Sequence, residues 1–341
     1  MQSVILCAVA GTVLMVLLGI LLAALLGLWL FGERGTLIRP STVEMIRAGG
    51  LRRLLNGDFL HAYLYGRWSN QYIGWGINRL FPRLPRDSKD RRWADQYHGK
   101  VLTHEQARSI ITLNRNIPLR DLEQIVPYRT ARDIVLTAAP DIVLYECPCR
   151  HSRPRPCLPT QVCMVIGRPF TGFMLEHNPK SSRRVSREEA LEVLRSEHER
   201  GHIHAAYFKD VMLNRLFAIC NCCSCCCGGI EAMAHHGVPM LAPSGYVARI
   251  ASDRCEGCRA CESVCPFSAI TVSDTAAVAW DRCMGCGVCV EICPAEALAL
   301  ERDERKGTPL DVRIMAAEGE RKATPSDRAD MLTRAESRPR Q

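Results

Sequence analysis

Two cysteine runs near the C-terminal end of this 341-residue chain constrain its fold more than any other feature. They extend from Cys255 to Cys265 and from Cys283 to Cys293, and both read C-x2-C-x2-C-x3-C-P. A [4Fe–4S] cube needs four thiolates directed at four irons from different sides. Three closely spaced cysteines in a tight loop reach three of these irons. The two runs therefore predict a pair of [4Fe–4S] clusters.

The doubled run resembles the bacterial dicluster ferredoxins over about residues 245–302. The resemblance implies low-potential transfer of single electrons, and a fourth ligand that each run supplies to the cluster of the other run. A zinc site built from C-x2-C pairs is the alternative, but zinc motifs rarely repeat four-cysteine runs that end in proline. The implied ligand sets are Cys255, Cys258, Cys261 and Cys293 for the first cluster and Cys283, Cys286, Cys289 and Cys265 for the second.

Ten further cysteines lie upstream of these runs, outside the apolar N-terminal segment. Because adjacent cysteines point in different directions, one cluster cannot use all six cysteines between residues 220 and 227. We expect one additional Fe–S cluster, or two, in this middle region. Zinc binding and redox-active thiols are the alternatives. The candidate ligands are Cys147, Cys149, Cys157, Cys163, Cys220, Cys222, Cys223 and Cys225.

The middle cysteines belong to a longer pattern that includes Arg150, Gly201 and His204. The pattern is similar to a group of bacterial and archaeal multi-cluster ferredoxin-like proteins, in which the same block precedes a dicluster module. Arg150 is predicted either to donate hydrogen bonds to cluster sulfides or to form a surface salt bridge. Rieske-type spacing is absent. We therefore interpret four histidines as polar or packed residues rather than ligands, namely His202, His204, His235 and His236.

The N-terminal segment is a continuous apolar run from Val4 to Phe31. A membrane-spanning helix needs about 20 such residues, so the run predicts a transmembrane anchor. A cleaved signal peptide is the alternative, but the first three residues carry no charged side chain and no small-residue cleavage site follows. Between residues 32 and 100 there are 13 Arg and Lys against 6 Asp and Glu. The positive-inside rule therefore predicts a single-pass cell-membrane protein whose C-terminal domain is cytoplasmic.

The segment from Leu51 to Phe81 mixes aromatic residues with arginine. It is predicted either to lie on the membrane surface or to pack its aromatic face on the domain. Further along, Thr103 and Ser186 each begin a capping-box pattern that predicts a helix, the second of which ends near Gly201. Residues 202–208 and 217–220 are predicted to be short strands.

The whole pattern predicts the α+β class. The expected organisation is a transmembrane helix at 1–32, a basic juxtamembrane segment at 33–100, a cysteine-rich α+β domain at 101–244, a dicluster 4Fe-4S ferredoxin domain at 245–302 and a disordered charged tail at 303–341.

The predicted function is a membrane-anchored iron–sulfur protein that relays single electrons between redox partner proteins. Nucleotide-binding, P-loop and nucleophile-elbow motifs are absent from the sequence. This favours an electron carrier or an oxidoreductase subunit over a stand-alone enzyme. The basic charge lacks a recognition motif, which argues against nucleic-acid binding. The alternatives are an oxidoreductase subunit whose active site is the middle cysteine block, or an assembly protein that binds metals or clusters.

Overall fold

A seven-stranded sheet forms the centre of the molecule in the computed structural model, which describes residues 2–83, 96–113, 117–120, 133–136, 141–213 and 215–315. The strand order is β6-β4-β5-β8-β7-β1-β9, and every pair is antiparallel except β1 with β9. A separate two-stranded antiparallel sheet pairs β2 (Ile117–Arg120) with β3 (Asp133–Leu136). The strands of the large sheet are β1 (Tyr97–Leu102), β4 (Ile142–Glu146), β5 (Gln161–Ile166), β6 (Ser182–Arg184), β7 (Ile203–Lys209), β8 (Leu216–Cys222) and β9 (Leu241–Ala242).

Both faces of this sheet are buried. Successive side chains of a strand point to opposite faces, and the structure buries both sets. Leu144 and Phe208 lie in the core on one face, and Val143 and Tyr207 lie in the core on the other. Helices α6 (His104–Ile111) and α9 (Arg187–Glu199) cover the first face. The second face is covered by α2 (Pro40–Leu55), α3 (Asp58–Arg67) and α8 (Phe170–His177). The structure thus confirms the α+β class.

The helix starts follow the predicted capping residues. Thr103 Oγ1 accepts a hydrogen bond from the Gln106 amide at 3.2 Å, and the Thr103 amide donates to Gln106 Oε1 at 2.9 Å. Ser186 Oγ accepts from the Glu189 amide at the start of α9. Gly201 follows the end of α9 with a φ of +79°, which glycine adopts without steric cost. The two predicted strands correspond to β7 and β8.

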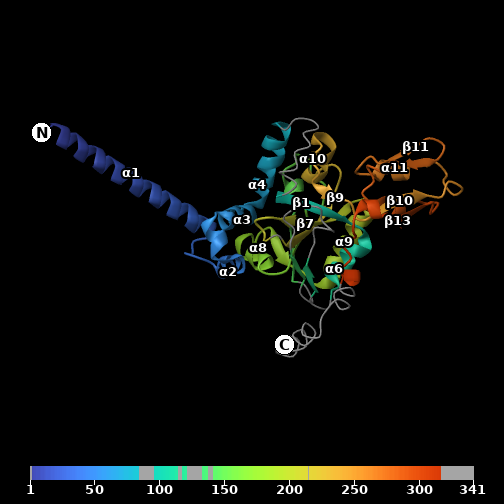
Figure 1. Cartoon of the computed structure of the whole chain (residues 1–341), viewed down its shortest axis with the longest axis horizontal. Coiled ribbons are helices and arrows are strands. Elements are labelled where there is room, and N and C mark those ends of the chain that lie inside the picture. Colours follow the sequence, from blue (N-terminus) through green and yellow to red (C-terminus); the bar gives the residue numbers. More distant parts are fainter. Residues whose placement is uncertain are drawn as a thin grey trace, which may run out of the picture.

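Helix α1 (Gln2–Gly32) projects from one end of the molecule (Figure 1). Its stretch from Gly11 to Gly32 is long and apolar enough to cross a membrane. The base of the helix packs into the domain, where the Trp29 ring stacks on Tyr63 with centroids 5.1 Å apart. Glu33 is fully buried there and accepts a hydrogen bond from Thr42 Oγ1 at 2.8 Å.

The aromatic segment that follows packs mainly on the domain. Tyr63 and Tyr65 of α3 are buried in the core. Helix α4 (Ser69–Trp75) continues into a π-helical turn, η1 (Gly76–Leu80), and a short 3₁₀ turn, η2 (Phe81–Arg83). Trp75 is exposed. Packing of the aromatic face is therefore confirmed for α3.

The C-terminal unit lies at the end of the molecule opposite α1 (Figure 1). Strand β10 (Tyr246–Ile250) pairs with β13 (Leu298–Arg302), and β11 (Ile270–Val272) pairs with β12 (Ala276–Val278). Two short helices, α11 (Ala260–Val264) and α12 (Val288–Glu291), lie between the strands, and α12 contacts α9.

The chain after β13 is more ordered than predicted. It forms a 3₁₀ turn, η4 (Glu304–Lys306), and then returns to the core beneath α6 and α9, where Leu310 and Val312 are fully buried. The predicted charged tail from residue 303 therefore includes a packed segment, because these two apolar side chains cover the sheet. Residues 316–341 of that tail lie outside the described residues.

Candidate metal centres

Six of the middle cysteines form a closed ring of thiols on the sheet face that carries α3 and α8. Each thiol lies close enough to two neighbours to shift their pKa values, and the last thiol is a neighbour of the first. In order, the members of this six-cysteine ring are Cys147, Cys149, Cys227, Cys222, Cys220 and Cys163. The ring thus combines cysteines from both sequence groups.

Local structure explains how each thiol reaches the ring. Cys220 and Cys222 are alternate residues of β8, so they lie on one face of the sheet, and Cys163 comes from the adjacent strand β5. Cys147 and Cys227 occupy the N-cap positions of α7 (Pro148–His151) and α10 (Gly228–His236). The C-x-C spacing within β8 therefore places both thiols on the face of the sheet that carries the ring.

The two N-cap thiols have lowered pKa values. The adjacent thiols of Cys149 and Cys163 lower the pKa of Cys147 well below its ordinary value, and a backbone N–H adds to this effect. The adjacent thiols of Cys149 and Cys222 likewise lower the pKa of Cys227. A lower pKa favours the thiolate, which is the form that binds metals.

The ring borders a cavity of about 130 Å³. One water molecule needs only about 10–15 Å³ by the same measure, so the space exceeds that of a single ion. Six soft thiol ligands and a cavity of this size fit a polynuclear iron–sulfur cluster. Aromatic side chains form much of the remaining wall, including Tyr65, Tyr72, Trp75, Phe81, Tyr97, Tyr145 and Tyr207.

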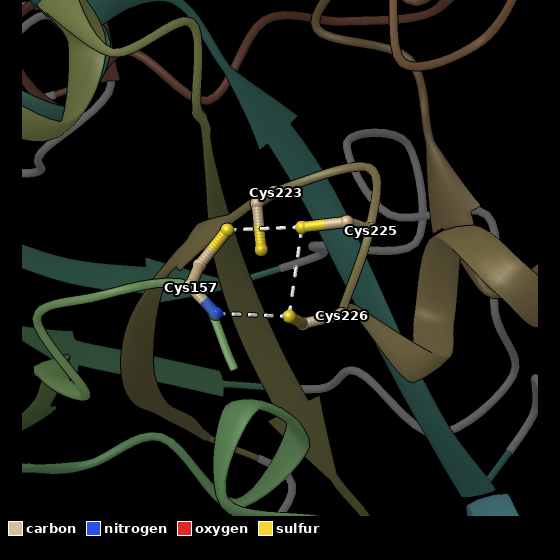
Figure 2. A group of neighbouring side chains, drawn as sticks. All are labelled: Cys157, Cys223, Cys225 and Cys226. Carbon is tan, nitrogen blue, oxygen red and sulfur yellow. Dashed lines mark hydrogen bonds between the residues drawn. The ribbon is translucent and has the colours of Figure 1, made fainter. Parts of the chain in front are cut away.

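The other four middle cysteines form a second, smaller group (Figure 2). The Sγ atoms of this four-cysteine group (Cys157, Cys223, Cys225 and Cys226) lie within 4.8 Å of one another. A tetrahedral ion with thiolates at about 2.3 Å separates its sulfur atoms by about 3.8 Å. The thiolates of a cubane bind four separate irons and must lie farther apart. The four-cysteine group therefore fits a single metal ion better than a cubane.

The structure separates the eight candidates from the sequence into these two groups. Cys157 and Cys163 lie in different groups. Cys226 and Cys227 were not among the candidates, although each belongs to a group. Their adjacency to Cys225 offered a signal, since neighbouring cysteines diverge and serve different sites.

Arg150 lies close to both groups. Its pKa is raised because the carboxylate of Glu197 and the nearby thiols of Cys223 and Cys147 offset the effect of burial. Arg150 Nη2 lies 2.5 Å from Glu197 Oε2, and both side chains are 1% exposed. The salt bridge predicted for Arg150 thus exists, but it is buried rather than at the surface.

The C-terminal cysteines occur in two equivalent environments. The Ala269 amide donates to Cys265 Sγ at 3.2 Å, and the Ala297 amide donates to Cys293 Sγ at 3.3 Å. Cys265 also lines a small cavity with three cysteines of the other run, namely Cys283, Cys286 and Cys289. Burial raises the pKa of the Cys261 thiol, and the nearby Cys255 and Cys258 add to this effect. Hydrogen bonds to ligand sulfurs tune cluster potentials.

Residues 247–294 match the family model of the 4Fe-4S dicluster domain. The chain contains a dicluster ferredoxin module. This module, matched over residues 247–294, accounts for two [4Fe–4S] clusters and supports a role in iron–sulfur electron transfer. No curated protein and no solved structure shows significant similarity to the chain.

Gly285 allows the second cysteine loop of the ferredoxin module to approach β10. Its φ is +66°, and a Cβ at this position would collide with the carbonyl oxygen of Tyr246 and with Ser244 Oγ. We expect Gly285→Ala to destabilise the protein by about 1–3 kcal/mol, the range for a strained backbone, and to lower its iron content. Urea unfolding and iron analysis measure both effects. Gly74→Ala in α4 is the control, and equal effects of the two substitutions would contradict this account.

Proposed function

We propose that this protein is a membrane-anchored electron carrier that relays single electrons between the ferredoxin module and an additional iron–sulfur cluster in the six-cysteine ring. When bound, each cluster supplies one-electron oxidation and reduction. The observation that carries the proposal is the six-cysteine ring, four of whose members are buried, beside a cavity of about 130 Å³. The proposed ferredoxin ligand sets are those implied by the sequence. The shared cavity of Cys265 with Cys283, Cys286 and Cys289 supports the second set.

The apolar core supports a relay between the two parts. Met284 and Val288 of the ferredoxin module are buried in the same core that contains Cys147 and Cys222 of the ring. Cys286, a proposed ligand of the second cluster, packs against this core. Continuous packing holds redox centres at fixed separations, which a relay of electrons requires.

Several contacts support membrane anchoring by α1. Trp29 and Glu33 are packed into the domain, so cleavage near the end of the apolar run would disrupt that packing. Exposed leucines on α2 and α3 provide further apolar surface next to the anchor, including Leu51, Leu54, Leu55, Leu60 and Leu64. We propose that the C-terminal side is cytoplasmic, where the ferredoxin module can meet soluble redox proteins.

Full-length protein purified anaerobically from membranes tests the relay. We expect about twelve or more irons per chain, since two [4Fe–4S] clusters account for about eight. Redox titration followed by electron paramagnetic resonance (EPR) should show the low-potential [4Fe–4S] signals and a further signal. About eight irons would contradict the additional cluster. The absence of low-potential signals after reconstitution would contradict the carrier function itself.

Membrane anchoring and orientation are tested by two separate measurements. We expect the protein to stay with membranes after an alkaline carbonate wash, and the ferredoxin module to resist protease added to the periplasmic side. Release by the wash would contradict an integral anchor. Digestion from the periplasmic side would contradict the proposed orientation.

The cavity favours a second candidate function, an oxidoreductase subunit whose active site adjoins the six-cysteine ring. Its aromatic wall resembles the apolar lining of small-molecule sites. Cyanide addition separates the two functions, because it binds an iron with an open coordination position. An altered EPR signal of the additional cluster would favour the enzyme, and an unchanged signal would favour the carrier.

A further inference from the structure

Three histidines meet on the sheet face opposite the six-cysteine ring. His104 begins α6, His198 lies in the last turn of α9, and His204 lies in β7. One ring nitrogen from each lies within 4.8 Å of the others. We propose that these side chains bind a first-row divalent metal ion, for which Zn²⁺ is the best match. This three-histidine site departs from the interpretation of His204 as a packed residue that the sequence suggested. It is separate from the cysteine groups and does not depend on the proposed electron transfer.

The nitrogen positions match the geometry of a zinc site. His104 Nδ1 and His204 Nε2 are 3.2 Å apart. Tetrahedral zinc with ligand bonds of about 2.0–2.1 Å places two imidazole nitrogens about 3.3 Å apart. The three rings lie close together, with centroids 4.8 to 5.3 Å apart. Two of the nitrogens therefore already lie at the separation that a shared ion requires.

Asn221 sets the tautomer of His204. The Asn221 Nδ2 group donates to the Val162 carbonyl at 2.7 Å, which turns Asn221 Oδ1 toward His204 Nδ1 at 2.6 Å. The His204 Nδ1–H therefore donates to this oxygen, and the Nε2 lone pair faces His104. Histidine ligands of metals commonly donate their second N–H to such an oxygen. Asn221 is thus a positioning residue for the site.

A buried ring nitrogen of His198 also supports a metal ion at this site. Its side chain is 7% exposed, and its Nδ1 has no hydrogen-bond partner among the described residues. A buried polar atom without a partner destabilises the folded protein. A simple hydrogen bond between His104 and His204 would explain their contact but would leave this nitrogen unpaired. A metal ion shared by three imidazoles offers His198 a partner as well.

The site also reaches the ferredoxin module. Glu291 Oε1 in α12 lies 3.8 Å from His198 Nε2, and Glu291 stands between Cys289 and Cys293 in the chain. A histidine that binds a metal ion through one ring nitrogen commonly turns its other N–H toward a carboxylate. Glu291 faces the second nitrogen of His198 in this way, so a water molecule supplies the fourth ligand. A bound ion would thereby fix His198 against the loop of the second ferredoxin run.

Zinc binding to the full-length protein, with its iron–sulfur clusters loaded, tests this site. The protein is incubated with Zn²⁺ and desalted, and its zinc is counted and examined by X-ray absorption. We expect a population of zinc with only nitrogen and oxygen ligands. His104→Ala should lose this population, about one zinc per chain, and retain any zinc bound by sulfur. The matched control is His235→Ala, an exposed histidine of α10.

The outcomes separate the site from its alternatives. Zinc bound only through sulfur in the unsubstituted protein would overturn the proposal, and this measurement does not depend on how a variant folds. An unchanged zinc content in His104→Ala would overturn it as well. A loss in His104→Ala but not in His235→Ala, with iron content unchanged, supports it. Iron content reports separately on the proposed electron carrier.

Discussion

Replacing Cys222 with alanine should remove the iron of the middle domain and leave the iron of the ferredoxin module in place. Cys222 is 6% exposed, and its thiol contacts Cys220 and Cys227 in the six-cysteine ring. Loss of one thiolate opens the ring and leaves an iron without its ligand. We expect about four or more irons per chain to be lost, the content of at least one cubane. Iron analysis of anaerobically purified protein measures this effect, and EPR follows the ferredoxin signals.

Cys225→Ala is the matched control for this substitution. Cys225 lies three positions along the same run but belongs to the four-cysteine group, with its Sγ atom 2.9 Å from Cys157 Sγ. We expect this variant to retain the iron of the middle domain. Equal iron losses in the two variants would mean that the ten middle cysteines serve one site, contrary to the separation seen in the structure.

Replacing Glu197 with alanine should lower the free energy of unfolding by about 3–5 kcal/mol, the usual cost of removing one partner of a buried ion pair. Arg150 would keep its charge in a site where it is 1% exposed. The Arg150 guanidinium also donates to the carbonyl oxygens of Pro159 and Asn221, near Cys157 and within β8. Loss of the Glu197 carboxylate should therefore destabilise the structure around both cysteine groups. Urea unfolding under anaerobic conditions measures the change.

Glu192→Ala provides the comparison for Glu197. Glu192 lies on the same helix and pairs with Arg195, but both side chains are more than half exposed. Exposed pairs contribute about 0.2–1 kcal/mol, so this substitution should have little effect. A loss below about 1 kcal/mol for Glu197→Ala would contradict a central role of the Arg150–Glu197 pair.

The helices and strands near strong local signals were predictable from the sequence. The capping residue Thr103 marks the start of α6, and Gly201 follows the end of α9. These signals act over one turn of chain, where hydrogen bonds depend on neighbouring residues only. The packed segment at Leu310 and Val312 was not predictable, because two apolar residues in a charged stretch form no periodic pattern.

The candidate sites show the same contrast between local and distant information. Each ferredoxin run supplies several ligands within a few residues, so the spacing alone indicates the kind of cluster. The middle cysteines gave only a set of candidates, and their separation into a ring and a group of four depends on how β5, β8, α7 and α10 meet. Likewise, His104 and His204 lie 100 positions apart in the chain, so only the fold brings them together.

The sequence by itself determined that this protein has a dicluster ferredoxin module, because the ligands of such clusters are close together along the chain. It also determined an apolar N-terminal helix, since length and composition are local properties. The tertiary structure alone decided which middle cysteines share a site and which histidines meet. Those groupings depend on strand order and on the face to which each side chain points, and both are settled only when distant segments pair in one sheet.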